Sequence, residues 1–296
     1  MQWGQIKTLF ILSFLVLDLF LFQQFLNKQT NEELSTLPQE TVDQKDIDFS
    51  AVPNEKAPAI DVIRASPDEF TSDNLSEIEK LDKSEQEYSI KKNRLLVSKF
   101  KDPIKIDEDH IVSQVSENIP FANQYSYWTW NKDKNALLFF QKANNRTIYY
   151  NKGGSLVIHV KDGKMVSYSA ALLNIADSSS FSSGDDAAVL SARDAASSLR
   201  PALSSGDKIT DTSIGYYSRV NLEFGVENGA QVFNPTWKFT VNGKKDYFVD
   251  GLQGTLLNME EDQFIDDTIS IINKNIEPSS ETLKQANERS AEGDAE

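Results

Sequence analysis

The chain has 296 residues and a formal net charge of −15 at pH 7, with 45 acidic against 30 basic side chains. This acidic balance disfavours nucleic acid as a partner, because phosphate binding needs a basic face. The absence of cysteine excludes a disulfide framework, a thiolate zinc site and a thiol nucleophile, and the two histidines leave little for a histidine-based site.

The first expected element is an apolar segment from Ile6 to Leu26. A helix of this length spans about 30 Å, the thickness of the hydrocarbon core of a bilayer. No pair of small residues follows it, as a cleavable signal peptide would need, so we expect a retained transmembrane signal anchor over 1–28. Lys7 stands at the N-terminal end of the segment and acids follow the segment, which predicts a cytoplasmic N-terminus and an extracellular C-terminal domain.

Asp18 is an ionisable residue inside this apolar run. A charge at that depth costs roughly a few kcal/mol on insertion scales. Two interpretations stay open: a contact with a polar group on a partner helix, or a tolerated acid in the outer half of the span. The first interpretation predicts a helix contact face that consists of Phe14, Leu17, Asp18 and Leu21.

Residues 29–88 are polar and acidic and contain four prolines. Low hydrophobicity with high charge favours a stalk or linker over a region with its own core. Within it, Leu75, Ile78 and Leu81 recur at spacings of three, which predicts a short helix over 72–87 that docks on the following domain.

A first α+β subdomain is expected over 89–176. Leu95–Phe100 is typical of a strand, and Asp107–Ile119 is typical of a helix capped by Asp107. Further strands are joined by short turns, of which Asp162-Gly163 is the strongest signal, so they pair antiparallel. These strands are 125–130, 137–141, 147–150, 156–161 and 165–171.

A second α+β subdomain is expected over 177–262. It begins with a helix over Asp185–Leu199, and Asn242-Gly243 makes a tight turn between two of its strands. The strands are 213–220, 236–241, 246–249 and 255–258. Both subdomains therefore have a helix followed by an antiparallel meander, which suggests an internal duplication.

The last segment, 263–296, is an acidic tail. Its isoleucines recur at spacings of four, three and four, which predicts one face of a short helix that docks on the domain. They are Ile265, Ile269, Ile272 and Ile276. The remainder has the composition of a disordered segment.

No motif in the chain indicates catalysis. The G-x-S-x-G elbow, a kinase catalytic loop and a phosphate-binding glycine loop preceding a helix are all missing. The acidic run Asp107–Asp109 lacks the other ligands of an EF-hand. We therefore expect no catalytic, metal or cofactor site, with His110 on a helix surface or near the helix cap and His159 on a sheet face.

One expected strand is rich in aromatic residues, namely Tyr125, Tyr127, Trp128 and Trp130. Core packing explains most of them, since alternate residues of a strand face opposite sides. Those that face outward would form an interaction surface, because Trp and Tyr are enriched at binding hot spots.

The first 25 residues resemble the start of the YycI (WalI) family, and the matching residues are Trp3, Lys7, Thr8, Phe10, Ile11, Leu17, Asp18 and Phe22. Further on, Pro235-x-Trp237, Tyr247–Asp250 and Gly254 resemble a PepSY-type pattern. The resemblance implies an N-terminal transmembrane helix and an extracytoplasmic region of two helix-plus-antiparallel-sheet, PepSY-like subdomains.

Members of that family are membrane-tethered accessory proteins of the WalK (YycG) sensor histidine kinase, which controls cell-wall metabolism, and they act with a sister protein, YycH. The resemblance thus implies a non-enzymatic regulator that contacts a WalK-like kinase and a YycH-like protein. The alternative is an extracytoplasmic module that binds a peptide or a cell-wall ligand. Neither interpretation fixes whether the kinase is activated or inhibited.

Overall fold

The computed structural model describes residues 45–56, 59–70, 76–78, 85–176, 188–220 and 229–276, with seven isolated helical positions between 7 and 22. The chain divides into two compact units. The smaller consists of Met1–Asp48 and Arg200–Lys208, and the larger of Phe49–Leu199 and Ile209–Glu296. Within the described residues, no helix combines the length and hydropathy that a membrane crossing requires.

The smaller unit joins two distant pieces of chain. Asp48 forms a parallel bridge with Lys208, and their side chains are paired at 3.2 Å. The ammonium group of Lys45 donates hydrogen bonds to the carbonyl oxygens of Arg200, at 3.1 Å, and Leu203, at 2.7 Å. A short 3₁₀ turn, η4 (Arg200–Ala202), supplies the first of these acceptors.

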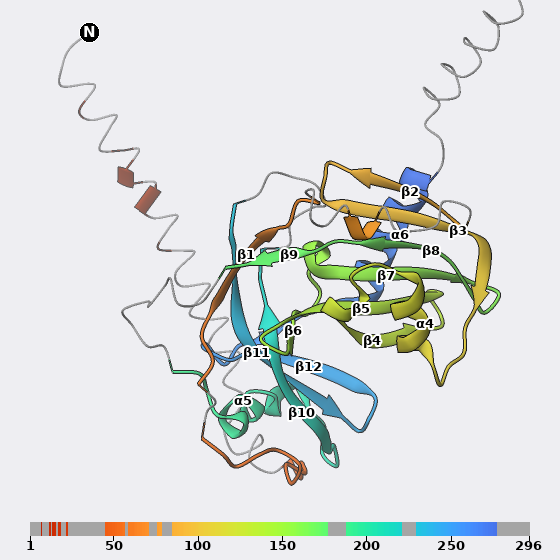
Figure 1. Cartoon of the computed structure of the whole chain (residues 1–296). Coiled ribbons are helices and arrows are strands. Elements are labelled where there is room, and N and C mark those ends of the chain that lie inside the picture. The colour runs from red at the N-terminus through yellow and green to blue at the C-terminus, as the bar shows by residue number, and fades with distance from the viewer. Residues whose placement is uncertain are drawn as a thin grey trace, which may run out of the picture. The chain divides into compact units, whose positions relative to one another are not determined.

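The larger unit contains a first sheet of seven antiparallel strands in the order β2-β3-β8-β7-β5-β4, with β6 beside β5 (Figure 1). The strands are β2 (Gln86–Lys91), β3 (Leu95–Lys105), β4 (Tyr125–Asn131), β5 (Ala136–Ala143), β6 (Arg146–Thr147), β7 (Ser155–Lys161) and β8 (Lys164–Ala170). Asp162 and Gly163 have φ of 51° and 71°, the two positive values that a tight hairpin turn between β7 and β8 requires.

The second sheet has six strands in the order β13-β12-β11-β1-β9, and β10 pairs with β11. They are β1 (Ile63–Pro67), β9 (Leu173–Ile175), β10 (Ile209–Tyr217), β11 (Gln231–Val241), β12 (Lys245–Asp250) and β13 (Leu256–Leu257). The long β11 organises this sheet, because it pairs antiparallel with β10, β12 and β1.

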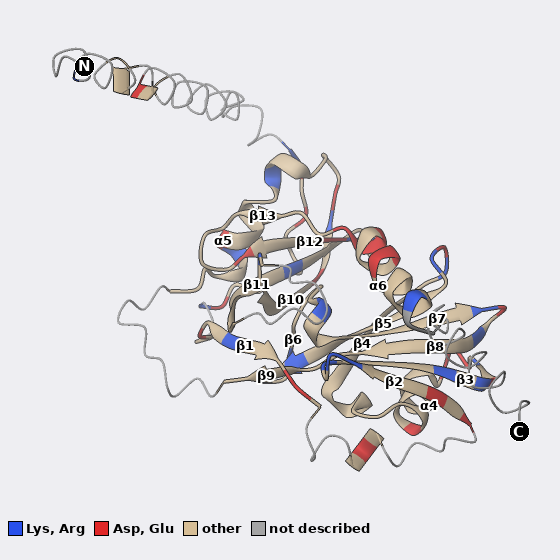
Figure 2. Ribbon diagram, turned by 90° about the horizontal axis from the view of Figure 1, so that it is seen from above, with Lys and Arg blue, Asp and Glu red and all other residues tan. Residues whose placement is uncertain are grey.

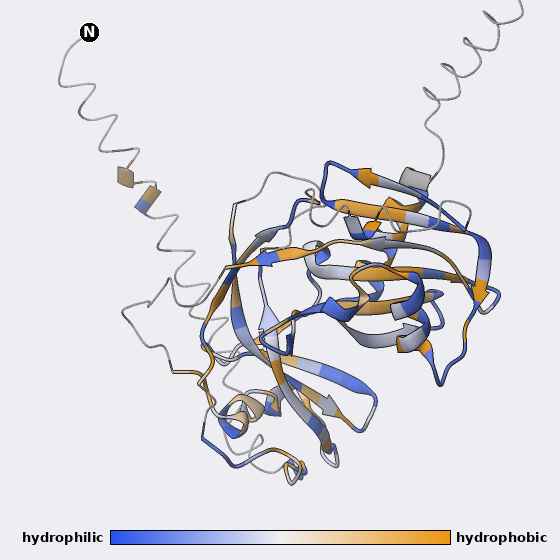
Figure 3. Ribbon diagram, in the orientation of Figure 1, coloured by the Kyte–Doolittle hydropathy of each residue, from blue (hydrophilic) through white to orange (hydrophobic). Residues whose placement is uncertain are grey.

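Helices cover both faces of the first sheet. α4 (Ile111–Asn118) packs through Ile111 and Val115 against one face, and α6 (Glu261–Ile276) packs through Phe264 and Ile265 against the other. Along β5, Leu137 and Phe139 join the α4 core while Leu138 and Phe140 join the α6 core. A strand that is buried on both faces needs a continuous apolar run, which explains the orange stretches along the central strands in Figure 3.

α5 (Ala192–Ser197) packs on the second sheet through small residues. Ala192, Ala195 and Ala196 are buried, so the helix backbone approaches the strands closely. The indole nitrogen of Trp237 on β11 donates a hydrogen bond of 3.0 Å to the carbonyl of Leu190, which fixes the segment before the helix. The expectation of a mixed α+β fold with antiparallel sheets is therefore confirmed.

Two of the expected helices, 107–119 and 185–199, begin later than the sequence predicts. α4 starts at Ile111, with His110 rather than Asp107 at the N-cap position. The Asp107 carboxylate instead accepts hydrogen bonds from the Asp109 backbone, at 3.1 Å, and pairs with the His110 ring at 2.9 Å, which holds a turn before the helix.

The predicted 185–199 helix is likewise shorter. Its residues 185–187 lie outside the described part, 188–191 are not helical, and α5 begins after Ser191, whose hydroxyl accepts from the Asp194 backbone. The predicted strand 147–150 also ends early. β6 stops at Thr147, since Ile148 turns away to form a parallel bridge with Tyr216.

The predicted subdomain boundaries do not separate the two sheets. β1 falls in the expected 29–88 stalk, yet it lies between β11 and β9 in the second sheet, so the stalk prediction is wrong for 63–67. β9 comes from the expected first subdomain and pairs in the second sheet, and α6 from the tail packs on the first. The two halves therefore interleave within one unit.

Of the helix expected over 72–87, the structure describes Ser76–Ile78 as helical, while 86 and 87 belong to β2. Ile78 is fully buried and joins the α4 core, as the docking prediction requires. The tail helix is confirmed as α6, in which Ile265 and Ile272 are fully buried and Ile269 is partly buried. Residues 277–296 lie outside the described part.

Candidate functional site

The four aromatic residues of β4 do not form one exposed strip. Tyr125 is 5% exposed and its hydroxyl donates to the Ala171 carbonyl at 2.8 Å. Trp130 is partly buried against the α4 core, and Trp128 packs in the α6 core. Tyr127, 39% exposed, is the aromatic of this group that faces solvent, and its role in binding stays a prediction.

The register explains this dispersal. The pairing of β4 with β5 shifts between Tyr127 and Thr129, so Trp128 is an extra residue that interrupts the alternation of faces. Its ring lies 5.5 Å from that of Phe140 and 6.2 Å from that of Phe248. Trp128 therefore links β5 of the first sheet with β12 of the second.

The predicted membrane contact residues lie in the sparsely described N-terminal region. Phe14, Leu17 and Asp18 are helical, and Phe14 and Leu17 are 55% and 48% exposed. Leu21 lies outside the described residues. The contact face remains a prediction.

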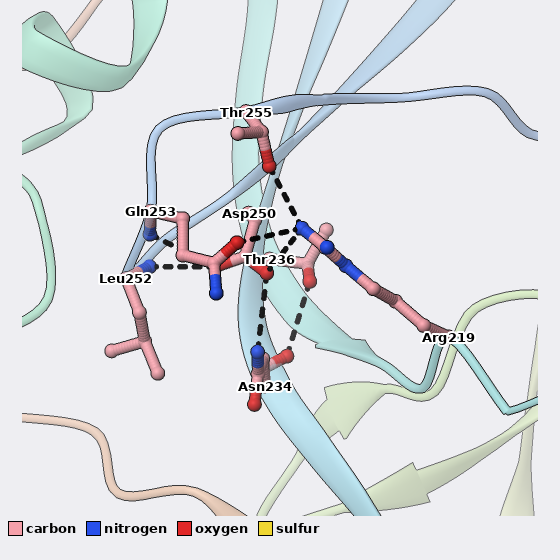
Figure 4. Close-up of polar contacts among 7 residues, drawn as sticks. All are labelled: Arg219, Asn234, Thr236, Asp250, Leu252, Gln253 and Thr255. Atoms are coloured by element: carbon pink, nitrogen blue, oxygen red, sulfur yellow. Dashed lines mark hydrogen bonds and ion pairs between the residues drawn. The ribbon is translucent and has the colours of Figure 1, made fainter. Parts of the chain in front are cut away.

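A buried carboxylate, Asp250 at the end of β12, is the centre of the polar network in Figure 4. One of its oxygens accepts from the backbone nitrogens of Leu252, at 2.9 Å, and Gln253, at 3.1 Å. The other accepts from the Asn234 amide at 3.1 Å and lies 3.4 Å from the Arg219 guanidinium. These four contacts use the acceptor capacity of the carboxylate.

The hydrogen bonds around Asp250 stabilise the turn between β12 and β13 and do not present a reactive group. Arg219 also donates to the side chains of Gln253, at 2.9 Å, and Thr255, at 2.8 Å. Gly254, with φ of 67°, donates its backbone N–H to the Asp250 carbonyl at 2.8 Å. This closed turn accounts physically for the Asp and Gly of the PepSY-type pattern.

A second network fastens the start of α6 to the first sheet. The Glu261 carboxylate accepts hydrogen bonds of 3.0 Å each from the indole of Trp128, the hydroxyl of Tyr150 and the amide of Asn131. Burial, and next the negative charge of Glu261, raise the pKa of Tyr150 well above its ordinary value, so the phenol stays a donor.

Ion pairs continue this attachment along α6. Lys134 pairs with Asp266 at 2.6 Å, and Lys152 pairs with Asp267 at 2.8 Å. Figure 2 shows the acidic first half of the helix in red. This role of the acids in attaching α6 was not predicted from the sequence. The acids lie in the first turns of an amphipathic helix, where the helix N-terminus is positive, and this placement could have indicated that they help to hold the helix in place.

The two histidines lie apart. His110 is exposed beside Asp107, and its hydrogen bond holds the pKa of Asp107 below the ordinary range. His159 is half-buried on β7, where burial and then the charge of Lys161 lower the pKa of its imidazole. The described residues contain no group of three or more histidine, aspartate or glutamate side chains arranged to hold a metal ion.

These features define the class of protein: an α+β domain of two antiparallel sheets whose buried polar groups serve turns and helix docking. The family model described as "YycI protein" matches residues 27–252, which is most of the chain. The chain therefore belongs to the YycI family. No curated protein matches it. The match ends before α6 begins.

Proposed function

We propose that this chain is a membrane-anchored, non-enzymatic regulator of a WalK-like sensor histidine kinase that controls cell-wall metabolism, and that it acts with a YycH-like protein. The observation that carries the proposal is the match to the YycI family over 27–252. The apolar segment Ile6–Leu26 supports an anchor with the N-terminus in the cytoplasm and the C-terminal domain outside the cell.

A membrane-tethered protein can regulate a neighbouring kinase simply by binding one state of the kinase more tightly than the other. A kinase that exchanges between two states is shifted toward the state that its neighbour binds better. Coupling of this kind is typically about 1–3 kcal/mol, which is a change of about 5–150-fold in the equilibrium. We assign the contact with the kinase inside the bilayer to one face of the anchor helix, which consists of Phe14, Leu17, Asp18 and Leu21.

In the larger unit, the two sheets are joined directly by backbone contacts. The two sheets meet where Tyr149 donates its backbone N–H to the Tyr216 carbonyl at 2.8 Å and Ile148 bridges to Tyr216. A glycine is required there, because a Cβ at Gly215 would lie 2.6 Å from the Tyr149 ring and closer still to the Thr147 carbonyl oxygen. A partner that binds either sheet thereby acts on both.

A membrane two-hybrid assay against a full-length WalK-like kinase tests the proposal. We expect interaction with the full-length chain, a weaker signal with Asp18→Leu, and a signal close to the full-length value with Asp18→Asn, which keeps a polar group at that depth. A form with an unrelated anchor separates contacts of the helix from contacts of the outer domain. Equal absence of signal from all forms would remove the kinase from the proposal.

A further inference from the structure

A pocket opens where two strands of the first sheet lose their regular register. The pairing of β3 with β8 shifts between Lys99 and Ile104, and the pairing of β7 with β8 shifts between His159 and Val160. Extra residues in adjacent strands splay the sheet locally and re-aim side chains, as bulges near binding sites commonly do. The pocket at this place has a volume of about 470 Å³.

Three of its lining residues lie in a row across the sheet. Lys99 on β3 is directly opposite Ser167 on β8, and Ser167 is directly opposite His159 on β7, so all three share one face. Lys101 and Lys161 line the same pocket, and Asn273 of α6 borders it. Three ammonium groups, an imidazole and a hydroxyl therefore surround one hollow.

Two of the lysines in this pocket, Lys99 and Lys161, have no acidic partner among the residues that the structure describes. No carboxylate of those described residues lines the pocket. Lys132, Lys134 and Lys152 are each paired with an acid. In a chain of net charge −15, two lysines that line one pocket without an acidic partner need an explanation.

The floor of the pocket is also polar. Ser167 is only 4% exposed, and it lines the pocket between Lys99 and His159. Figure 2 shows blue segments along β3 and at the outer ends of β7 and β8, around the same place.

We propose that this pocket binds a phosphate-bearing anion. Lysine ammonium groups bind phosphate as point charges, and several of them suit a multiply charged anion better than a single carboxylate. The Ser167 hydroxyl and the His159 ring supply directed hydrogen bonds at the floor. The volume exceeds that of one phosphate group, so there is room for the residue esterified to it.

The electrostatics fit this assignment. Burial lowers the pKa of His159 and the charge of Lys161 lowers it further, so the ring is neutral at pH 7 and serves as a hydrogen-bond donor. A soluble phosphate ester and a phospholipid headgroup share the recognised chemistry, and the experiment must distinguish them. Anion binding at this pocket does not require any contact between the chain and the kinase.

The test uses the full-length chain in uncharged detergent micelles, labelled in its histidine rings. The chain has two histidines, so the ring spectrum contains one reporter in the pocket, His159, and one control, His110. Pyrophosphate, glycerol 3-phosphate and dihexanoyl phosphatidylglycerol are titrated in turn. We expect saturable shifts of the His159 signals with His110 unchanged. Shifts with pyrophosphate or glycerol 3-phosphate identify a soluble phosphate compound as the ligand, and shifts with the lipid alone identify a headgroup.

Lys99→Gln combined with Lys161→Gln should weaken binding at least about tenfold, since each ammonium group contributes a charge-assisted hydrogen bond. Lys56→Gln combined with Lys244→Gln is the matched control, because both lysines are exposed and lie outside the pocket. Ser167→Ala should weaken binding without changing the net charge. The proposal is overturned if none of the three compounds shifts His159, or if the pocket and control pairs bind equally.

Discussion

Glu261 provides the sharpest test of how the C-terminal helix is held. Its carboxylate accepts three hydrogen bonds, from Trp128, Tyr150 and Asn131. Glu261→Ala removes all three and leaves two aromatic donors without a partner in a partly buried setting. A hydrogen bond to a charged group contributes about 1.5–3 kcal/mol, and a stranded buried donor costs about 1–3 kcal/mol.

Water reaches Glu261, which is of intermediate burial, and replaces part of the loss. We therefore expect the free energy of unfolding to fall by about 2–3 kcal/mol rather than by the sum of the three bonds. A domain of roughly 150–250 residues loses about 2–4 °C of Tm per kcal/mol, so Tm should fall by about 4–12 °C.

The assay is thermal unfolding of the full-length chain followed by near-UV circular dichroism, with hydrogen exchange of the α6 amides as the local readout. The Tm of Glu261→Gln should lie between those of wild type and Glu261→Ala. The amide nitrogen of the glutamine cannot accept a hydrogen bond, so at least one of the three donors loses its acceptor. Gln263→Ala is the matched control, because Gln263 is exposed on the same turn of α6. A Glu261→Ala chain that melts within about 1 °C of wild type, with α6 exchange unchanged, would refute the reasoning.

Three further predictions follow from other parts of the structure. Gly215→Ala should lower the free energy of unfolding by at least about 2 kcal/mol, because the added methyl group overpacks the junction of the sheets. Gly229→Ala is the control and should leave it unchanged, because the space around that position is open. Denaturant titration measures both variants. Burial raises the pKa of Tyr149 to about 12, so this group stabilises the fold below pH 10, and its contribution is lost as pH rises toward 12. Tyrosinate absorbance of the native chain should therefore rise in two phases. A single phase near pH 10 would contradict the burial of Tyr149. His159 should titrate below the ordinary pKa of 6.5 in NMR, and its stabilising contribution should be lost as pH falls below that value, while Lys161→Gln should move the titration upward.

Hairpins and apolar runs were predictable because the signals for them are local. Asp162-Gly163 and Asn242-Gly243 adopt the positive φ values that their residue types favour, and they place the turns correctly. The isoleucine spacing in the tail likewise predicted a helix with one buried face, and Ile265 and Ile272 are fully buried in α6. In each case, a few neighbouring residues carry the information.

β1 was missed because its local sequence carries little strand signal. The segment Ile-Arg-Ala-Ser-Pro lies in a polar, proline-containing region, and its partners on β11 are about 170 positions away along the chain. Ile63 and Ala65 bury one face of the strand, but this short alternation becomes meaningful only when the second sheet exists. Tertiary pairing, rather than propensity, makes this segment a strand.

The helix starts and the candidate pocket depend on side-chain competition and register. Asp107 has the residue type of an N-cap, yet its carboxylate closes a turn with Asp109 and His110, so the helix begins four residues later. The row of Lys99, Ser167 and His159 depends on which residues of three strands stand opposite each other, and two bulges alter that register. Bulge positions cannot be deduced from periodicity alone.

The most direct test of the central claim is the autophosphorylation rate of a WalK-like kinase in proteoliposomes, with and without the full-length chain. Coupling of about 1–3 kcal/mol shifts the ratio of active to inactive kinase by about 5–150-fold, so the rate should change in one direction by up to that factor, and Asp18→Leu should reduce the effect. An unchanged rate at saturating chain, in proteoliposomes where both proteins are shown to be inserted, would contradict the account.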